Sequence, residues 1–162
     1  MAVRLNNFIS LNNILYKYQF GFRKNYSITL AVIDVVDEIY EHLDKGETGL
    51  GIYLDLKKAF DTVNHDILLY KLYNYGIRGT VYDWFKCYLS NRSQYTVVND
   101  FLSATEEVTC GVAQGSVLGP TLFLLDINDI YNAIPDVNVK LFADDTNVFL
   151  FDKDCQLSLI HI

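Results

Sequence analysis

Hydrophobic residues change their spacing several times along this chain, and that alternation restricts the fold more than any other feature of the sequence. Apolar residues recur at helical spacing from Ile28 to Leu43, behind Ser27 as a candidate cap. Residues 50–54 then form a short apolar run, typical of a strand, with Asp55 at its end. The sequence therefore predicts a domain that mixes helices and strands.

The rest of the chain continues this alternation. We expect helices at 64–76, capped by Asn64 and closed by Gly76, at 80–91, and at 117–134, capped by Ser116. We expect one hairpin within 94–111, turning at Asn99-Asp100, and a final hairpin of 137–143 and 146–151, turning at Asp144-Asp145. The fold class that follows is α+β with a largely antiparallel sheet.

Composition narrows the function classes. The 162 residues are 51% hydrophobic, enough for a packed core, so disorder is not expected. The net charge of −7 argues against an autonomous nucleic-acid binder that relies on neutralising phosphates. The three cysteines include no C-x-x-C pair, so we expect free thiols rather than a zinc site or a disulfide framework. No signal peptide or bilayer-length apolar stretch is visible, so we expect an intracellular protein without a membrane partner.

The adjacent carboxylates Asp144 and Asp145 raise the question of function. Two like charges about 4 Å apart repel by about 4 kcal/mol at an effective dielectric of 20. One interpretation is solvated turn chemistry, because aspartate favours turns. The other depends on Asp55: if its strand joins the same sheet, three carboxylates converge, and divalent cations would relieve their repulsion. Oxygen ligands without cysteine or histidine favour Mg²⁺.

Four segments carry a family resemblance. They resemble successive motifs of reverse transcriptases, and they are "YQFGFRKNYSITLA" at 18–31, "IYLDLKKAFDTV" at 52–63, "GVAQGSVLGPTLF" at 111–123 and "FADD" at 142–145. Their wording is similar to that of non-LTR retrotransposons of the LINE and jockey-like type. The resemblance implies a right-hand polymerase palm with partial fingers. It implies fingers at 1–48, palm at 49–152 and an unplaced tail at 153–162.

The resemblance also implies roles for individual residues. Asp55 and Asp144 match the two principal metal ligands, and Asp145 matches a supporting acid, around two Mg²⁺ ions for which Mn²⁺ can substitute. Phe60 matches the bulky residue that excludes a ribonucleotide 2′-hydroxyl; the other interpretation is core packing. The remaining candidates are Gln114 and Gly115, in the loop at the incoming nucleotide, and Arg23, which either reaches the triphosphate or faces solvent.

The function that the resemblance implies is RNA-directed DNA polymerisation, with an RNA template, a DNA primer and deoxynucleotides as partners, in the nucleus and cytoplasm. The family's thumb, primer grip and endonuclease segments have no counterpart in the sequence, so we expect the isolated chain to extend primers poorly. One alternative is a catalytically inactive retroelement remnant that acts as a binding module. Another, a different two-metal polymerase or nuclease, is disfavoured by Phe60 and the Gln114-Gly115 loop.

Overall fold

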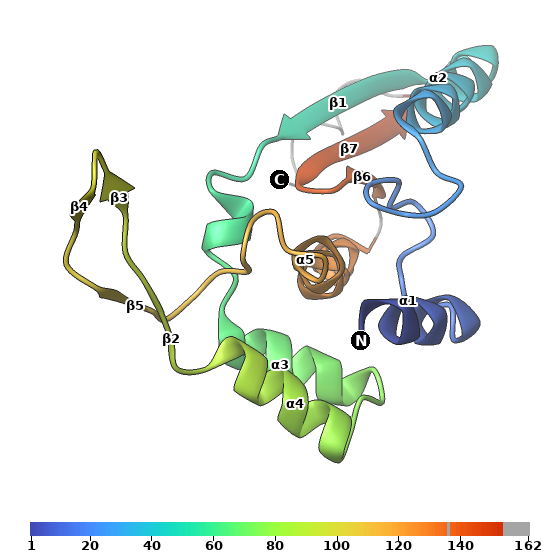
Figure 1. Ribbon diagram of the computed structural model, residues 1–162. Coiled ribbons are helices and arrows are strands. Elements are labelled where there is room, and N and C mark those ends of the chain that lie inside the picture. Colours follow the sequence, from blue (N-terminus) through green and yellow to red (C-terminus); the bar gives the residue numbers. More distant parts are fainter. Residues whose placement is uncertain (136, 154–162) are drawn as a thin grey trace. The chain divides into compact units, whose positions relative to one another are not determined.

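The computed structural model describes residues 1–135 and 137–153, and it combines helices with antiparallel strands (Figure 1). Its α-helices are α1 (Ala2–Leu11), α2 (Ile28–Asp44), α3 (His65–Asn74), α4 (Thr80–Leu89) and α5 (Gly119–Ile127), with 3-10 turns η1 (Ala59–Asp61) and η2 (Ile130–Ala133). Its strands are β1 (Thr48–Leu54), β2 (Arg92–Gln94), β3 (Val97–Val98), β4 (Phe101–Leu102), β5 (Glu106–Val108), β6 (Asn138–Phe142) and β7 (Asp145–Asp152). The predicted α+β class is confirmed.

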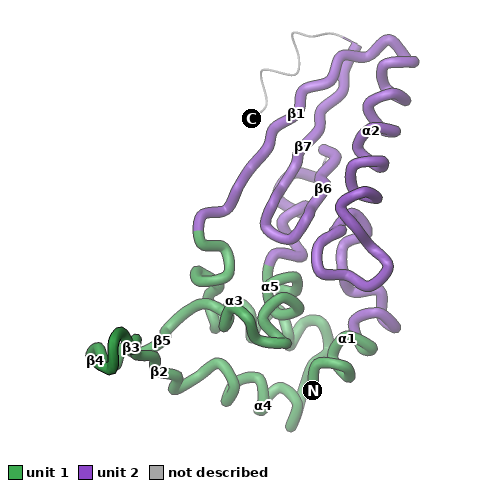
Figure 2. The backbone as a smooth tube through the Cα atoms, turned by 45° about the horizontal axis from the view of Figure 1, so that its top comes forward, with its two compact units in different colours: residues 1–8, 58–126 green, residues 9–57, 127–162 purple. Residues whose placement is uncertain are grey.

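The chain forms two compact units (Figure 2). Unit 1 comprises residues 1–8 and 58–126, and unit 2 comprises residues 9–57 with the part of the chain that begins at residue 127. Each unit is assembled from segments that are distant in the sequence. The predicted boundary between fingers and palm, at residue 48, falls inside unit 2 and stays a prediction.

Unit 2 is built around a three-stranded antiparallel sheet in the order β1-β7-β6. β1 pairs with β7 from Thr48 opposite Asp152 to Leu54 opposite Thr146. The strand that precedes Asp55 and the hairpin that carries Asp144 therefore lie in one sheet, which is the condition for their carboxylates to come close together. Helix α2 begins as predicted, because the Ser27 side chain accepts a hydrogen bond from the Leu30 amide at 3.2 Å.

An ion cluster links α2 to the middle of β6. Lys140 points from β6 toward α2, where its Nζ bonds to Asp34 and lies 2.9 Å from Glu38 Oε2. Its side chain is only 5% exposed, and its Nζ lies 3.9 Å from the ring centroid of Tyr18. Burial alone would lower the pKa of Lys140, but the bonds to Asp34 and Glu38 outweigh that effect, so the pKa lies above its ordinary value.

Unit 1 holds the helices and the hairpin that were predicted for residues 64–111. Asn64 caps α3 by accepting hydrogen bonds from the amides of Asp66 and Ile67. The α3–α4 pair buries Leu68, Leu72, Phe85 and Leu89, each at most 2% exposed. The β3–β4 hairpin turns at Asn99 and Asp100, which both have positive φ, as in a type I′ turn.

Two predicted boundaries were wrong. The predicted helix over 117–134 ends at Ile127 and resumes as η2, because the buried Asn128 uses its amide to bond the backbone of Ile14 and Tyr16. The final hairpin turns at Ala143-Asp144, one residue before the predicted Asp144-Asp145, as the pairing of Phe142 with Asp145 shows. The shift occurs because the buried Gln19 side chain bonds both backbone groups of Ala143. Asp145 is thereby the first residue of β7 rather than part of the turn.

The remaining structural expectations concern thiols and membranes. Cys87 and Cys110 are free and exposed, as expected, whereas Cys155 lies outside the described residues. So does nearly all of the tail at 153–162, of which only Lys153 is described. In the described part of the chain, no helix combines the length and the apolar character that crossing a bilayer requires.

Candidate functional site

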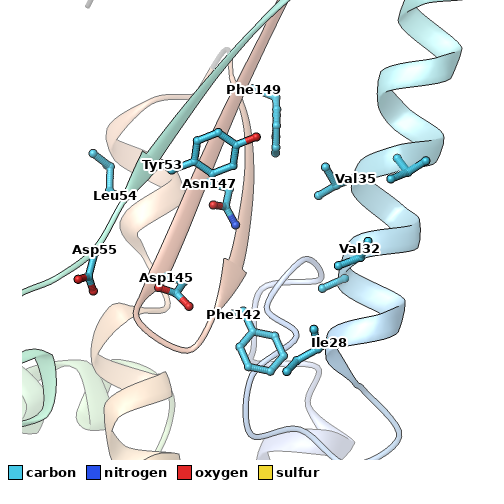
Figure 3. A pocket seen from close by; sticks show the side chains of 12 residues that line it. Ile28, Val32, Val35, Tyr53, Leu54, Asp55, Phe142, Asp145, Asn147 and Phe149 are labelled. Carbon is cyan, nitrogen blue, oxygen red and sulfur yellow. The ribbon is translucent and has the colours of Figure 1, made fainter.

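Two aspartates that are distant in the sequence meet at one end of the unit 2 sheet. The β1–β7 ladder ends at Leu54 opposite Thr146, so continuing its register places Asp55 opposite Asp145. Figure 3 shows both side chains at the same end of the two strands. Both residues are exposed. The sheet thus presents a pair of carboxylates that solvent, ions or a substrate can reach.

Asp55 and Asp145 line a pocket of about 530 Å³ that lies between α2 and the sheet (Figure 3). The other lining residues are Ile28, Ala31, Val32, Val35 and Val36 from α2, with Tyr53, Leu54, Phe142, Asn147 and Phe149 from the strands or their ends. Asp55 and Asp145 are the charged residues of this lining, and the α2 wall is apolar.

Asp144 occupies a different position from its neighbour. It is a half-buried turn residue whose carbonyl accepts a hydrogen bond from Thr146 Oγ1 at 3.3 Å, and it is outside the described lining of the pocket. Within residues 1–135 and 137–153, no three histidine, cysteine or acidic side chains form a group arranged to hold a metal ion. The convergence of Asp55, Asp144 and Asp145 around one ion therefore stays a proposal.

The donor atoms nevertheless suit a hard divalent cation. Asp55 and Asp145 offer only carboxylate oxygens, and neither cysteine nor histidine lines this pocket. Mg²⁺ prefers such ligands, and it is commonly held by one or two protein carboxylates together with water and substrate phosphates. Asp55 and Asp145 therefore offer donor atoms of the kind that Mg²⁺ takes.

Arg23 has several contacts within unit 2. Its Nη1 donates to the carbonyls of Tyr16 and Gln19, both at 3.0 Å, and its guanidinium lies 4.1 Å from the ring centroid of Tyr26. It is half-buried rather than fully solvated. These contacts give Arg23 a structural role in the 16–26 loop, and a contact with a triphosphate would have to use its other N–H groups.

Phe60 lies in unit 1, where its ring stacks on Phe123 with centroids 4.4 Å apart. Phe123 is 2% exposed, whereas Phe60 is half-buried. The carbonyl of Phe60 also accepts a hydrogen bond from the Val112 amide at 2.8 Å. One part of the ring therefore packs against the core, which gives support to the packing interpretation while leaving the other part accessible.

The loop with Gln114 and Gly115 is also in unit 1. Gln114 is exposed, and its Nε2 donates to Asp61 Oδ1 at 2.8 Å. This bond links Asp61 directly to a candidate nucleotide-binding residue. Gly115 has φ of +76°, and a Cβ there would meet open space, so its backbone conformation is the reason for glycine in this structure.

Sequence reasoning missed a residue at the Asp144 turn. Gln19 is 1% exposed, and its side chain bonds to the backbone of Ala143. Its position inside the "YQFGFR" segment at 18–23 was noted only for the resemblance of that segment to a finger motif. In the sequence, Gln19 is a polar residue between two aromatic ones, Tyr18 and Phe20. This pattern is compatible with a buried, hydrogen-bonded glutamine, but it does not indicate which residue is the hydrogen-bond partner.

Comparison with known proteins gives the class first. The family model described as "Reverse transcriptase (RNA-dependent DNA polymerase)" matches residues 1–161. The chain therefore belongs to the reverse transcriptase family.

Similar proteins indicate which group of reverse transcriptases the chain resembles. The chain is 34% identical over 144 residues to the "RNA-directed DNA polymerase from mobile element jockey" of Drosophila melanogaster, covering 85% of this chain and 16% of that protein. It is 30% identical over 161 residues to the "Probable RNA-directed DNA polymerase from transposon BS" of the same species, covering 99% of this chain and 17% of that protein. The resemblance to non-LTR retrotransposon polymerases is thus confirmed, and the chain spans about a sixth of the length of these relatives.

Proposed function

We propose that this chain is the palm, with part of the fingers, of an RNA-directed DNA polymerase that extends a DNA primer on an RNA template. The observation that supports the proposal is the antiparallel pairing of β1 with β7, because it leaves Asp55 and Asp145 at the same end of the sheet, next to the Ala143-Asp144 turn. Family membership and the order of the four motifs support the same reading.

In the proposed reaction, the primer 3′-oxygen forms a bond to the α-phosphorus of a deoxynucleotide. The bond from that phosphorus to the bridging oxygen breaks, pyrophosphate leaves with its electron pair, and the proton of the 3′-hydroxyl passes to solvent. Two Mg²⁺ ions, when bound, would activate the attacking oxygen and stabilise the leaving group. Asp55 and Asp144 would hold them through their carboxylates, and Asp145 would support the pair. Mn²⁺ would serve as a substitute.

The other candidate residues have roles in nucleotide selection. Phe60 is the proposed steric gate against the 2′-hydroxyl. Gln114, oriented by its bond to Asp61, and Gly115 form the loop at the incoming nucleotide. Arg23 is the weakest of these candidates, because its Nη1 already bonds two backbone carbonyls.

The direct test is primer extension on an RNA template with Mg²⁺ and deoxynucleotides. It should compare the isolated chain with a chimera in which residues 1–152 replace the matching segment of the jockey polymerase. We expect extension by the chimera and little by the isolated chain, since primer positioning requires near-attack geometry and ~1 Å of misplacement can cost on the order of 10²-fold. A folded chimera that binds primer-template without extending it would favour the alternative, an inactive remnant that only binds.

Phe60→Val tests the steric gate in the same chimera. Removing the ring should open space for a 2′-hydroxyl, so we expect ribonucleotide use relative to deoxynucleotide use to rise about 10-fold, with deoxynucleotide use largely kept. The measurement is kcat/KM for matched ribo- and deoxynucleotides. Phe123→Leu is the control, because it alters the stacking partner without shortening Phe60. Unchanged selectivity together with a lowered Tm would assign Phe60 to packing alone.

A further inference from the structure

Gln19 forms a buried clamp on the turn that carries Asp144. Its Nε2 donates to the Ala143 carbonyl at 3.2 Å, and its Oε1 accepts from the Ala143 amide at 2.9 Å. Oε1 also accepts from the Gly21 amide at 2.8 Å. One side chain thus satisfies both backbone groups of Ala143, although 124 residues separate the two in the sequence.

Ala143 needs such support. Its φ of +56° is uncommon for a residue other than glycine, asparagine or aspartate, and such conformations persist only where surrounding contacts impose them. Ala143 is buried, so its backbone groups would be left unsatisfied without Gln19. The conformation of Ala143 determines how the chain enters Asp144 and Asp145.

The segment that carries Gln19 is itself fixed against β6. The Phe20 amide donates to the Leu141 carbonyl at 2.7 Å, and the Leu141 amide donates to the Tyr18 carbonyl at 2.9 Å. Gly21 allows this close approach, because a Cβ there would lie 2.2 Å from the Ala143 nitrogen. Arg23 adds a bond from Nη1 to the Gln19 carbonyl. The backbone around Gln19 is therefore fixed by hydrogen bonds, in addition to the bonds that its side chain makes to the turn.

We propose that Gln19 is a positioning residue for the polymerase site: it fixes the Ala143-Asp144 turn and thereby the carboxylates of Asp144 and Asp145. This inference rests on the proposed function for its catalytic meaning. Gln19 touches neither substrate nor metal, and it acts through the backbone of Ala143. Groups that orient metal-ligating side chains commonly change metal affinity or activity 10- to 100-fold when they are removed.

Gln19→Met is the main variant, because it keeps the length of the side chain and removes its hydrogen bonds. The matched control is Asn128→Leu, which removes another buried amide of unit 2 that bonds two backbone groups, those of Ile14 and Tyr16. Both variants should lose stability, but only Gln19→Met removes the clamp on the turn. The comparison therefore separates positioning from general structural loss.

Two measurements on the 162-residue chain report the effect. The first is hydrogen exchange at the Ala143 amide, which we expect to be at least 10-fold faster in Gln19→Met than in Asn128→Leu. The second is the Kd for Mn²⁺ by calorimetry, which we expect to rise about 10-fold in Gln19→Met and to stay near the wild-type value in Asn128→Leu. If Gln19→Met does not fold, Gln19→Glu is the second variant, because it keeps an acceptor oxygen for the Ala143 amide. Exchange at the Ala143 amide of Gln19→Glu should then remain slower than the rate for an unstructured peptide, and exchange at that peptide rate would contradict the role of Gln19.

The outcomes separate this inference from the proposed function. Wild-type protection of the Ala143 amide in a folded Gln19→Met protein, or a Kd equal to that of Asn128→Leu, would overturn the positioning role. If the wild-type chain does not bind Mn²⁺, or if Asp55→Asn binds it with the wild-type Kd, the result would count against the metal site. The exchange measurement would still decide whether Gln19 holds the turn.

Discussion

Primer extension by the chimera is expected to fall about 10³-fold or more when Asp55 is replaced by Asn, because several kcal/mol of metal-based stabilisation of the transition state depends on its charge. The substitution keeps the size of the side chain and leaves the β1–β7 ladder intact, since that ladder ends at Leu54. The measurement is the single-turnover rate with saturating primer-template and Mg²⁺.

Asp66→Asn is the matched control, because Asp66 is an exposed acid in the first turn of α3 and lines none of the described pockets. Its rate should remain within about twofold of the wild-type rate, as is usual for surface changes. Asp144→Asn and Asp145→Asn decide between the neighbouring acids. We expect the larger loss for Asp144→Asn. The reverse order would transfer the ligand role to Asp145, which shares the pocket with Asp55.

Lys140→Met should have the largest effect on stability, lowering the free energy of unfolding by about 2–3 kcal/mol. Removing the cation leaves Asp34 and Glu38 without their buried partner, which usually costs 3–5 kcal/mol, and the partial exposure of Asp34 reduces that figure. Urea unfolding near pH 7 measures the loss. Lys45→Met is the control, because its partner Glu41 lies on the exposed side of α2, and such surface pairs contribute little.

The pH dependence gives a second check on Lys140. Because its pKa is higher in the folded chain than in the unfolded one, its stabilisation is complete below the unfolded value of about 10.4. It is lost as the pH rises through the higher folded value. The stability difference between wild type and Lys140→Met should therefore be constant from about pH 8 to 10 and shrink above that range. A difference that grew with rising pH would refute the ion cluster.

Elements whose signals lie in neighbouring residues could be predicted from the sequence. Ser27 and Asn64 cap α2 and α3 through amides two or three residues away, so the caps could be recognised from neighbouring residues alone. Asn99-Asp100 formed the expected turn for the same reason, because both residues tolerate positive φ. The motifs also determined the family, since four of them occur in order.

Features that depend on partners distant in the sequence could not be predicted, because those partners come together only in the folded chain. Lys140 reads as an ordinary strand lysine, and only the packing of α2, 106 residues earlier, makes it a buried partner of Asp34. Gln19 likewise selects Ala143-Asp144 as the turn, against the local preference for Asp144-Asp145, because its three buried hydrogen bonds stabilise a backbone conformation that alanine disfavours. Local propensity extends over a few residues, whereas the geometry beside the carboxylates is imposed by hydrogen bonds between residues that only the fold brings together.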